Sequence, residues 1–315
     1  MQTRFTAVKA QRLKLKARIG LTGVTNSGKT YTALVIAKGL LQAENLYTSE
    51  GKLDWSKVAV IDSERKRVLF YADIPEFGQF TFIDFQPPYH PKYYIEAVKY
   101  AKECGAEIII IDSISHAWNG TGGVLDIVRE RTERSKTKNS MMDGWGGAEG
   151  GTALQNKMID EILSVDAHVI ATFRQKMDYA VEKDEQGKLK IQKLGVKPQQ
   201  REDLEYEFDI TLKLDSEHNA EIIKNTVKFL NKEGDILAPI TEEFGRYLGE
   251  YLSSGAPYET ILNSQLEDAK KKIKEMVTVK PSLKEIYEMY SKTPLSQETN
   301  LELLIEIIRN MKECM

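Results

Sequence analysis

The sequence predicts an α/β fold in which helices flank a mostly parallel, doubly wound sheet, followed by a small helical C-terminal appendage. Short apolar segments alternate with amphipathic helical segments over residues 1–252, the order that parallel strands and their crossover helices require. Residues 108–111 form an unbroken run of isoleucines, which is typical of a central parallel strand covered on both faces. From residue 253 the sequence is charge-rich and helix-forming, so we expect two domains, residues 1–252 and 253–315.

The composition indicates an ordinary folded protein. With 315 residues, of which 41% are apolar and 29% charged, the chain can bury one substantial core and keep residues for a small second part. No segment approaches the roughly eighteen uninterrupted apolar residues of a membrane span, and the basic N-terminal segment lacks the apolar run of a signal peptide. We therefore expect a cytoplasmic protein with no membrane partner. The two cysteines, Cys104 and Cys314, offer no metal-binding spacing, and a net charge of -3 disfavours a surface that coats nucleic acid throughout.

The first half of the chain predicts a strand that runs straight into a glycine-bearing turn and then a helix. The strand covers residues 15–21, and the helix covers residues 29–42 with apolar side chains at three- and four-residue spacing. The elements expected next are strands at 58–61 and 80–85, a helix at 91–104, and a strand at 108–111 that ends at Asp112.

The second half predicts a long irregular segment at residues 116–151, because eight glycines interrupt it and a loop of this length is usually functional or disordered. The charged, poorly periodic segment 176–201 is expected to be a loop or a hairpin. The remaining elements are a helix at 152–163, strands at 168–173, 208–214 and 221–230, and an amphipathic helix at 300–311 in an appendage broken at Pro281 and Pro294.

The turn after the first strand satisfies the phosphate-binding pattern G-x-x-x-x-G-K-[ST]. Its residues are Gly23, Val24, Thr25, Asn26, Ser27, Gly28, Lys29 and Thr30, and we add the following residue, Tyr31, to the nucleotide-binding set. Glycines let backbone N–H groups surround phosphate oxygens, Lys29 reaches the β- and γ-phosphates, and the hydroxyl of Thr30 binds Mg²⁺. A chance match in a glycine-rich turn is the alternative, which the strand before it and the helix after it disfavour. We expect ATP or another nucleoside triphosphate, with Mg²⁺.

Two carboxylates follow predicted strands at the same edge of the sheet. Asp112 ends the isoleucine strand, where it would orient a metal-bound water, unless it only caps a buried strand. Glu64 follows the strand after the phosphate-binding helix, where it could activate the attacking water as a general base. A solvated loop acid is the alternative for Glu64.

In these motifs and their order the chain resembles the RecA-like P-loop ATPases. That superfamily has a phosphate-binding loop, a catalytic Glu after the following strand, an apolar strand ending in Asp-Ser, and a polar sensor after the next core strand. The matching residues here are Lys29 with Thr30, Glu64, Asp112 with Ser113, and Gln175. The resemblance covers residues 15–235 and implies ATP hydrolysis with Lys29, Glu64 and Gln175 in catalytic positions.

More narrowly, residues 112–118 with the glycines after them, and residues 201–209, look like phage-encoded AAA family nucleotide-binding proteins. Those proteins are associated with DNA recombination and single-strand annealing. The resemblance implies a homo-oligomer, either a ring or a filament, with ATP at the subunit interface. It also implies DNA contacts from loops 116–151 and 176–200, and a single-strand-binding or annealing protein as partner.

Both loops carry residue types that suit single-stranded DNA. The candidates for phosphate contacts are Arg129, Arg131, Arg134, Lys136, Lys138 and Lys176, and the candidates for base stacking are Trp118, Trp145 and Tyr179. As alternatives, the basic residues form a solvated face, and a tryptophan beside glycines holds its loop to the core.

RecA-like assemblies usually supply a positive residue to the γ-phosphate of a neighbouring subunit. The candidates here are Arg201 and Lys213, although Lys213 could equally be an exposed strand residue. The histidines show no metal-ligand pattern. We expect His116 to order the segment after Asp112, and His168 to be a structural residue at the start of a strand.

Two other functions stay open. A P-loop kinase acting on a small molecule normally needs an arginine-rich lid, and residues 176–201 contain a single arginine, Arg201, at their edge. A scaffold that binds ATP without hydrolysing it would use the helical C-terminal part for docking, and Glu64 argues against it.

Overall fold

A computed structural model of the chain describes residues 10–135, 140–183, 189–198, 200–201, 204–227 and 232–314. The chain divides into two compact units. The larger unit is Lys16–Tyr251, and the second contains the described residues up to Leu15 together with those from Leu252 onward.

The larger unit is built on one sheet, which has nine strands among the described residues. The strands are β1 (Arg18–Gly23), β2 (Val58–Asp62), β3 (Thr81–Asp84), β4 (Ile108–Asp112), β5 (His168–Lys183), β6 (Leu189–Pro198), β7 (Ile210–Leu214), β8 (Ala220–Asn225) and β9 (Ile236–Leu237). Their order is β3-β2-β4-β5-β1-β7-β8-β9, and β6 pairs with β5. The strands from β3 to β7 in this order are parallel, and β8 and β9 add an antiparallel edge. The predicted α/β fold with a mostly parallel sheet is confirmed.

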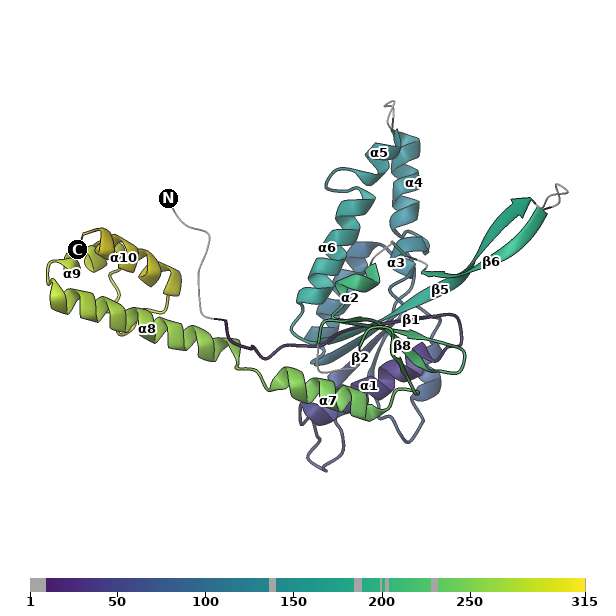
Figure 1. The fold of residues 1–315 in the computed structure, drawn as a ribbon, viewed down its shortest axis with the longest axis horizontal. Helices are drawn as coiled ribbons and strands as arrows, with labels where there is room; N and C mark the ends of the chain where they lie inside the picture. The colour runs from purple at the N-terminus through teal and green to yellow at the C-terminus, as the bar shows by residue number, and fades with distance from the viewer. Residues whose placement is uncertain are drawn as a thin grey trace. The chain divides into compact units, whose positions relative to one another are not determined.

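Helices cover both faces of this sheet (Figure 1). They are α1 (Lys29–Ala43), α2 (Pro91–Glu103), α6 (Gly151–Ser164) and α7 (Glu242–Ser253). In the view of Figure 1, α2 and α6 lie on one side of the strands, and α1 and α7 lie on the other. All five residues of β4 are buried, which explains why its sequence is apolar without alternation.

The segment 116–151 is helical, and the prediction of an irregular loop is wrong. It contains α3 (His116–Asn119), α4 (Val124–Arg134) and α5 (Ser140–Trp145). The glycines mark close packing between these helices. A Cβ on Gly144 would lie 2.4 Å from Thr132 Oγ1, and a Cβ on Gly151 would lie 2.5 Å from Val128 Cγ2. Glycine is required here because neighbouring elements pass too close for a larger side chain.

The segment after the core of β5 forms a hairpin, one of the two predicted alternatives. β5 continues beyond the sheet, and Gln175–Lys183 pairs antiparallel with Leu189–Pro198 of β6. Figure 1 shows this hairpin leaving the sheet. The predicted strand at 168–173 was too short, because the buried apolar run ends at Phe173 while the backbone pairing continues.

The second unit is helical, with α8 (Tyr258–Val279), α9 (Leu283–Tyr290) and α10 (Leu301–Glu313). The predicted amphipathic segment 300–311 corresponds to α10. The side chain of Asn300 caps this helix by accepting a hydrogen bond from Leu303 N at 3.0 Å. Leu304, Ile307 and Met311 are buried in a core shared with α8 and α9.

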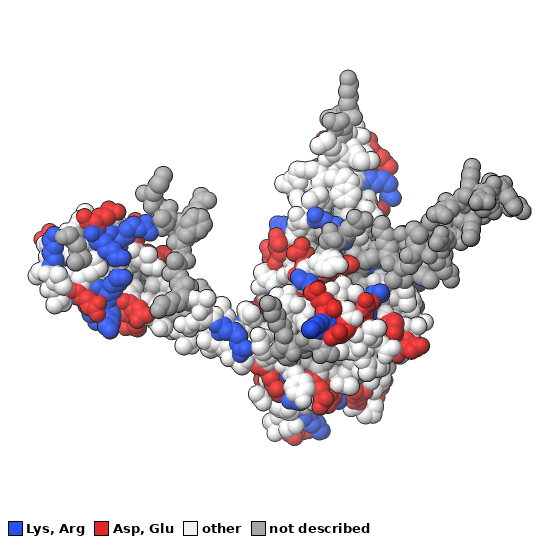
Figure 2. Space-filling view, in the orientation of Figure 1, with Lys and Arg blue, Asp and Glu red and all other residues white. Residues whose placement is uncertain are grey.

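Acidic and basic side chains are mixed on the face drawn in Figure 2, in keeping with the small net charge. Within the described residues, no helix combines the length and the apolar character needed to cross a membrane.

Candidate nucleotide-binding site

The phosphate-binding turn joins β1 to α1 with a tightly curled backbone. Gly28, immediately before α1, has a φ of 87°, in the left-handed region that favours glycine. A Cβ on Gly23 would lie 2.4 Å from Ser27 Oγ, and a Cβ on Gly28 would lie 2.9 Å from His218 Nδ1. Both positions therefore favour glycine in this turn.

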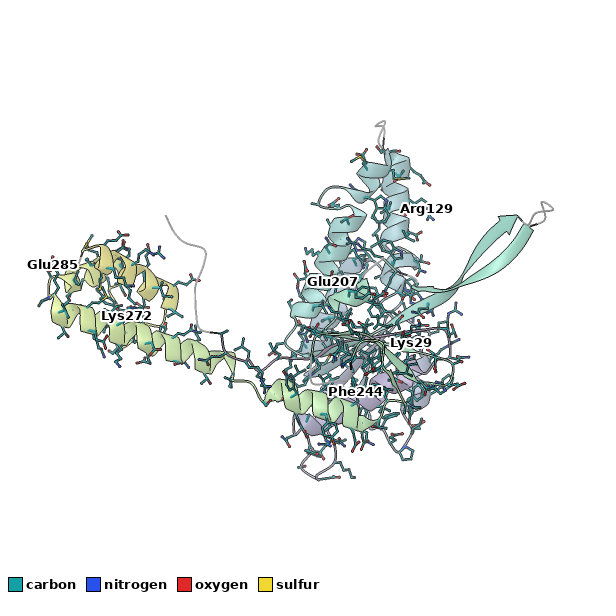
Figure 3. All side chains as sticks on the ribbon, in the orientation of Figure 1. Lys29, Arg129, Glu207, Phe244, Lys272 and Glu285 are labelled. Carbon is teal, nitrogen blue, oxygen red and sulfur yellow. The ribbon has the colours of Figure 1, made fainter. Side chains whose placement is uncertain are left out.

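Lys29 begins α1 and lies beside this turn (Figure 3). Its Nζ donates to the backbone oxygens of Gly23, at 3.0 Å, and Val24, at 2.7 Å. Burial lowers the pKa of Lys29, although the charges of Asp112 and Glu64 act in the opposite direction. The ammonium group therefore contacts the same turn that is predicted to bind a phosphate.

Thr30 and Asp112 meet, as the magnesium prediction requires. Thr30 Oγ1 donates to Asp112 Oδ2 at 2.5 Å, and Thr172 Oγ1 of β5 donates to Asp112 Oδ1 at 2.5 Å. Burial raises the pKa of Asp112, and the two hydroxyl groups act against that increase. A hydroxyl and a carboxylate beside a phosphate-binding turn are oxygen ligands of the kind Mg²⁺ takes together with substrate phosphates.

Glu64 lies beside the residue that follows Asp112, because β2 and β4 pair in parallel with Asp62 opposite Asp112. Its side chain is 12% exposed. Ser113 Oγ donates to Glu64 Oε1 at 2.9 Å, and Arg174 donates through Nε to Oε1 and through Nη2 to Oε2. Burial works to raise the pKa of Glu64, but the hydrogen bonds and charge of Arg174, with the bond from Ser113, hold it below its usual value.

Arg174 is a site residue that the sequence did not reveal. The predicted sensor was the next residue, Gln175, where β5 leaves the main sheet, but the hydrogen bonds from this strand to Glu64 come from Arg174. The sequence did offer one signal. Arg174 follows the buried part of one core strand, and Glu64 follows another, so a basic and an acidic side chain could be expected at the same edge of the sheet.

His116 connects α3 to the strand ends beside Glu64. Its Nδ1 lies 2.7 Å from Ser63 Oγ, and its ring stacks on Tyr89 with 4.8 Å between centroids. Ser63 N donates to Asp112 O at 2.7 Å. His168 is structural: its Nδ1 accepts from Ala17 N at 3.0 Å within the buried start of β5.

Aromatic rings gather next to the phosphate-binding turn. Tyr31 follows Thr30, and its ring lies 5.5 Å from that of Phe77 and 6.0 Å from that of Tyr71. Its hydroxyl donates to Glu76 Oε2 at 2.8 Å. Tyr71 and Phe77 were not predicted, and only the local density of aromatic residues could have indicated them.

The candidate DNA-binding arginines of α4 are paired with neighbours. Arg129 lies 2.8 Å from Asp126 Oδ1, Arg134 lies 3.3 Å from Glu130 Oε2, and Arg131 donates to Asp143 O at 3.2 Å. Figure 3 labels Arg129 on this helix. Lys136 and Lys138 lie outside the described residues, and Lys176 and Tyr179 lie outside the described side chains.

The two candidate tryptophans contact each other. The rings of Trp118 in α3 and Trp145 in α5 lie 5.6 Å apart, tilted by 38°. This contact joins α5 to α3.

Lys213 and Arg201, the two residues predicted to act on a neighbouring subunit, lie in different parts of the larger unit. Lys213 of β7 is opposite Thr22 of β1, one residue before the phosphate-binding turn, and its Nζ lies 3.0 Å from Glu221 Oε2. Arg201 donates to Asn156 Oδ1 of α6.

Residues 15–235 match a protein family described as an AAA domain. Comparison with curated proteins gives no match. The family match contains the phosphate-binding turn, Glu64, Asp112 and Arg174.

Proposed function

The chain belongs to the AAA domain family of nucleotide-binding P-loop ATPases, and on that premise we propose that it hydrolyses ATP with Mg²⁺, using Glu64 as general base. The observation that carries this proposal is the position of Glu64. Its side chain lies at the edge of the sheet where the parallel strands end. There it accepts a hydrogen bond from Ser113, the residue after Asp112. An acid in that place is within reach of a water beside the γ-phosphate.

The residues divide the work as follows. Backbone N–H groups of the turn and the ammonium of Lys29 bind the phosphates. Thr30 and Asp112 hold Mg²⁺, which neutralises charge on the phosphates when bound. Glu64 orients the attacking water and accepts its proton, and Gln175, the residue after Arg174 in β5, has the role of the polar sensor. The rings of Tyr31 and Tyr71 offer an apolar surface to the nucleotide base.

We further propose that hydrolysis serves single-stranded DNA recombination or annealing, in a phage-encoded protein of the bacterial cytoplasm. Two projecting elements support this, since both connect to the strand ends of the site. The α4–α5 pair connects through His116, and the β5–β6 hairpin connects through Arg174. The α4 arginines, Lys176 and the two tryptophans are the proposed DNA contacts, which would require the arginines to exchange their present partners for phosphates.

The test is steady-state ATP hydrolysis by the Glu64→Gln variant, with and without single-stranded DNA. We expect Glu64→Gln to bind ATP normally and to lose about 100-fold or more in turnover, because general-base catalysis contributes on that order. Glu103→Gln, at the exposed end of α2, is the matched control and should turn over like the wild type. Equal turnover of Glu64→Gln would remove Glu64 from the role.

The DNA proposal has its own outcome in the same assay. Single-stranded DNA should stimulate wild-type hydrolysis. Unchanged turnover, with phosphate appearing on a small acceptor molecule, would instead identify a kinase.

A further inference from the structure

We propose that His218, in the turn between β7 and β8, is a nucleotide-binding residue that donates a hydrogen bond to a phosphate shared by ATP and ADP. This inference rests on the proposed function, because it adds a contact to the same phosphate-binding turn. It assigns His218 to the affinity for nucleotide and leaves the chemical step to Glu64.

The turn between β7 and β8 runs beside the phosphate-binding turn. Strand β7 pairs in parallel with β1, and its last residue, Leu214, is opposite Gly23. Residues 215–219 then connect β7 to β8, and Ala220 of β8 is paired with Leu214. Because β1 and β7 end at the same edge of the sheet, the two turns that follow them are neighbours.

The side chain of His218 contacts the other end of the phosphate-binding turn. A Cβ on Gly28 would lie 2.9 Å from His218 Nδ1 and 3.6 Å from its Cε1 and Cγ. The Nδ1 edge of the imidazole therefore faces the backbone where α1 begins. Backbone N–H groups of such a turn surround the α- and β-phosphates, whereas the lysine reaches the β- and γ-phosphates. A ring beside Gly28 is therefore placed for the phosphates that ATP and ADP share.

The imidazole of His218 can donate to a ligand. The residue is exposed, and its ring nitrogens make no hydrogen bond within the part of the chain that the structure describes. A neutral imidazole has one N–H donor and a protonated one has two, so either form can donate to a phosphate oxygen. A hydrogen bond to a charged acceptor of this kind is stronger than one to a neutral group.

The phosphate-binding turn also contains a buried polar atom without a partner. Ser27 is fully buried, and its Oγ has no hydrogen-bond partner among the described residues. Buried polar atoms are normally paired, so an unpaired hydroxyl here fits a turn whose remaining polar contacts come from a ligand.

Hydrogen bonds within the β7–β8 turn fix the position of His218. Asp215 Oδ1 accepts from Glu217 N at 2.8 Å and from Asn219 N at 2.9 Å, and its Oδ2 accepts from Asn219 Nδ2 at 3.1 Å. The backbone of His218 has a φ of 69°, in the left-handed region, and its N donates to Asp215 O at 3.3 Å. Asp215 is thus a positioning residue, because it holds the turn that keeps the imidazole beside Gly28.

The experiment measures the dissociation constants of ADP and a non-hydrolysable ATP analogue for full-length His218→Gly and wild type, by isothermal titration calorimetry. Glycine adopts the left-handed conformation without strain, so this variant removes the ring and keeps the turn. We expect both nucleotides to bind more weakly by the same factor, roughly five- to twentyfold, because one partly solvated hydrogen bond to a charged group is lost. At saturating ATP, kcat should stay within about twofold of wild type, since a contact made equally in the ground and transition states changes KM.

Three variants of the same turn sharpen the comparison. Glu217→Ala changes the exposed side chain next to His218 and should bind both nucleotides normally. His218→Asn keeps an N–H donor and a residue type that accepts the left-handed conformation, so its affinities should lie between those of wild type and His218→Gly. Asp215→Ala should weaken binding by itself but add nothing to His218→Gly, because both changes act through one ring.

Failure of the inference can be told apart from failure of the proposed function. If Glu64→Gln hydrolyses ATP like the wild type, the proposed function fails, whatever the affinities of His218→Gly. If Glu64→Gln is inactive but His218→Gly binds both nucleotides like the wild type, only the inference is overturned. A loss confined to the ATP analogue, or an equal loss in Glu217→Ala, would also overturn it.

Discussion

Lys29 is the side chain on which the proposed phosphate binding depends most directly. Its Nζ lies over the turn, bonded to Gly23 O and Val24 O, so it needs only to exchange carbonyl oxygens for phosphate oxygens. The new bonds are stronger because the acceptor carries a full charge.

We expect Lys29→Ala to weaken ATP binding by about 10- to 100-fold, since a hydrogen bond to a charged group contributes about 1.5–3 kcal/mol. Titration with a fluorescent ATP analogue measures the effect. Lys38→Ala on the same helix, where Lys38 pairs with Glu242, is the control and should bind normally. Unchanged affinity of Lys29→Ala would contradict the assignment of the turn.

Asp62 lies 1% exposed at the end of β2, and burial raises its pKa to about 6 from its ordinary 3.8. Its Oδ1 accepts a hydrogen bond from Glu64 N, and its Oδ2 has no partner among the described residues. The folded protein therefore holds a proton on Asp62 at pH values where the unfolded chain has lost it. This contribution to stability is fully present below about pH 4 and is lost as the pH rises through 6.

Asp62→Asn removes this dependence and keeps an oxygen for Glu64 N. The variant should gain stability relative to wild type as the pH rises from 4 to 7, by about 2–3 kcal/mol, because one pKa unit corresponds to about 1.4 kcal/mol. Urea unfolding of both proteins at several pH values measures it. A stability difference that does not change with pH would count against the shifted pKa.

At the scale of elements, a few packing contacts stabilise the helices of the segment between β4 and α6. Val124 and Val128 of α4 are buried one helical turn apart, and the ring of Trp145 closes over Gly151 at the start of α6. The close approach of α5 and α6 to α4 depends on glycine, so the residues that suggested a loop instead permit helix packing.

Trp145→Ala should separate α5 from α3 and reduce the free energy of unfolding by about 1–3 kcal/mol, through lost ring packing and a partly filled cavity. Hydrogen exchange should increase in residues 140–151, while ATP binding stays unchanged. Met142→Ala on the same helix, with 70% of Met142 exposed, should change neither quantity. Unaltered exchange in Trp145→Ala would show that the ring contact does not hold this segment.

At the scale of the whole molecule, the proposed role for Arg201 or Lys213 requires a second copy of the chain. Each has a partner within its own chain, Asn156 for Arg201 and Glu221 for Lys213. Both contacts lie on the partly solvated surface. Exchanging Asn156 or Glu221 for a phosphate there would cost little free energy.

We expect ATP to drive assembly into a homo-oligomer, because a phosphate at a subunit interface would be bound from both sides. Light-scattering mass measured with and without a non-hydrolysable ATP analogue tests this, with Lys29→Ala as the control that should not assemble in response. A monomer at all nucleotide concentrations would rule out an interfacial site.

Much of the site follows from local sequence. The phosphate-binding turn is contiguous, and its strand and helix are set by adjacent residues. Asp112 could be placed near Thr30 in advance, because the carboxyl ends of parallel strands share one edge of the sheet. The sheet and the proximity of Thr30 to Asp112 could therefore be predicted without knowing any contact between distant parts of the chain.

Other features required the tertiary structure. The bond between Glu64 and Arg174 joins residues 110 positions apart and depends on the register of β2, β4 and β5. The helices of residues 116–151 could not be separated from a loop, since glycine at a tight helix contact and glycine in a loop look the same in sequence. The sequence by itself predicted the phosphate-binding turn, because one short segment makes the geometry of that turn. Only the packed sheet decided which side chain holds Glu64, because that depends on which strand ends lie side by side.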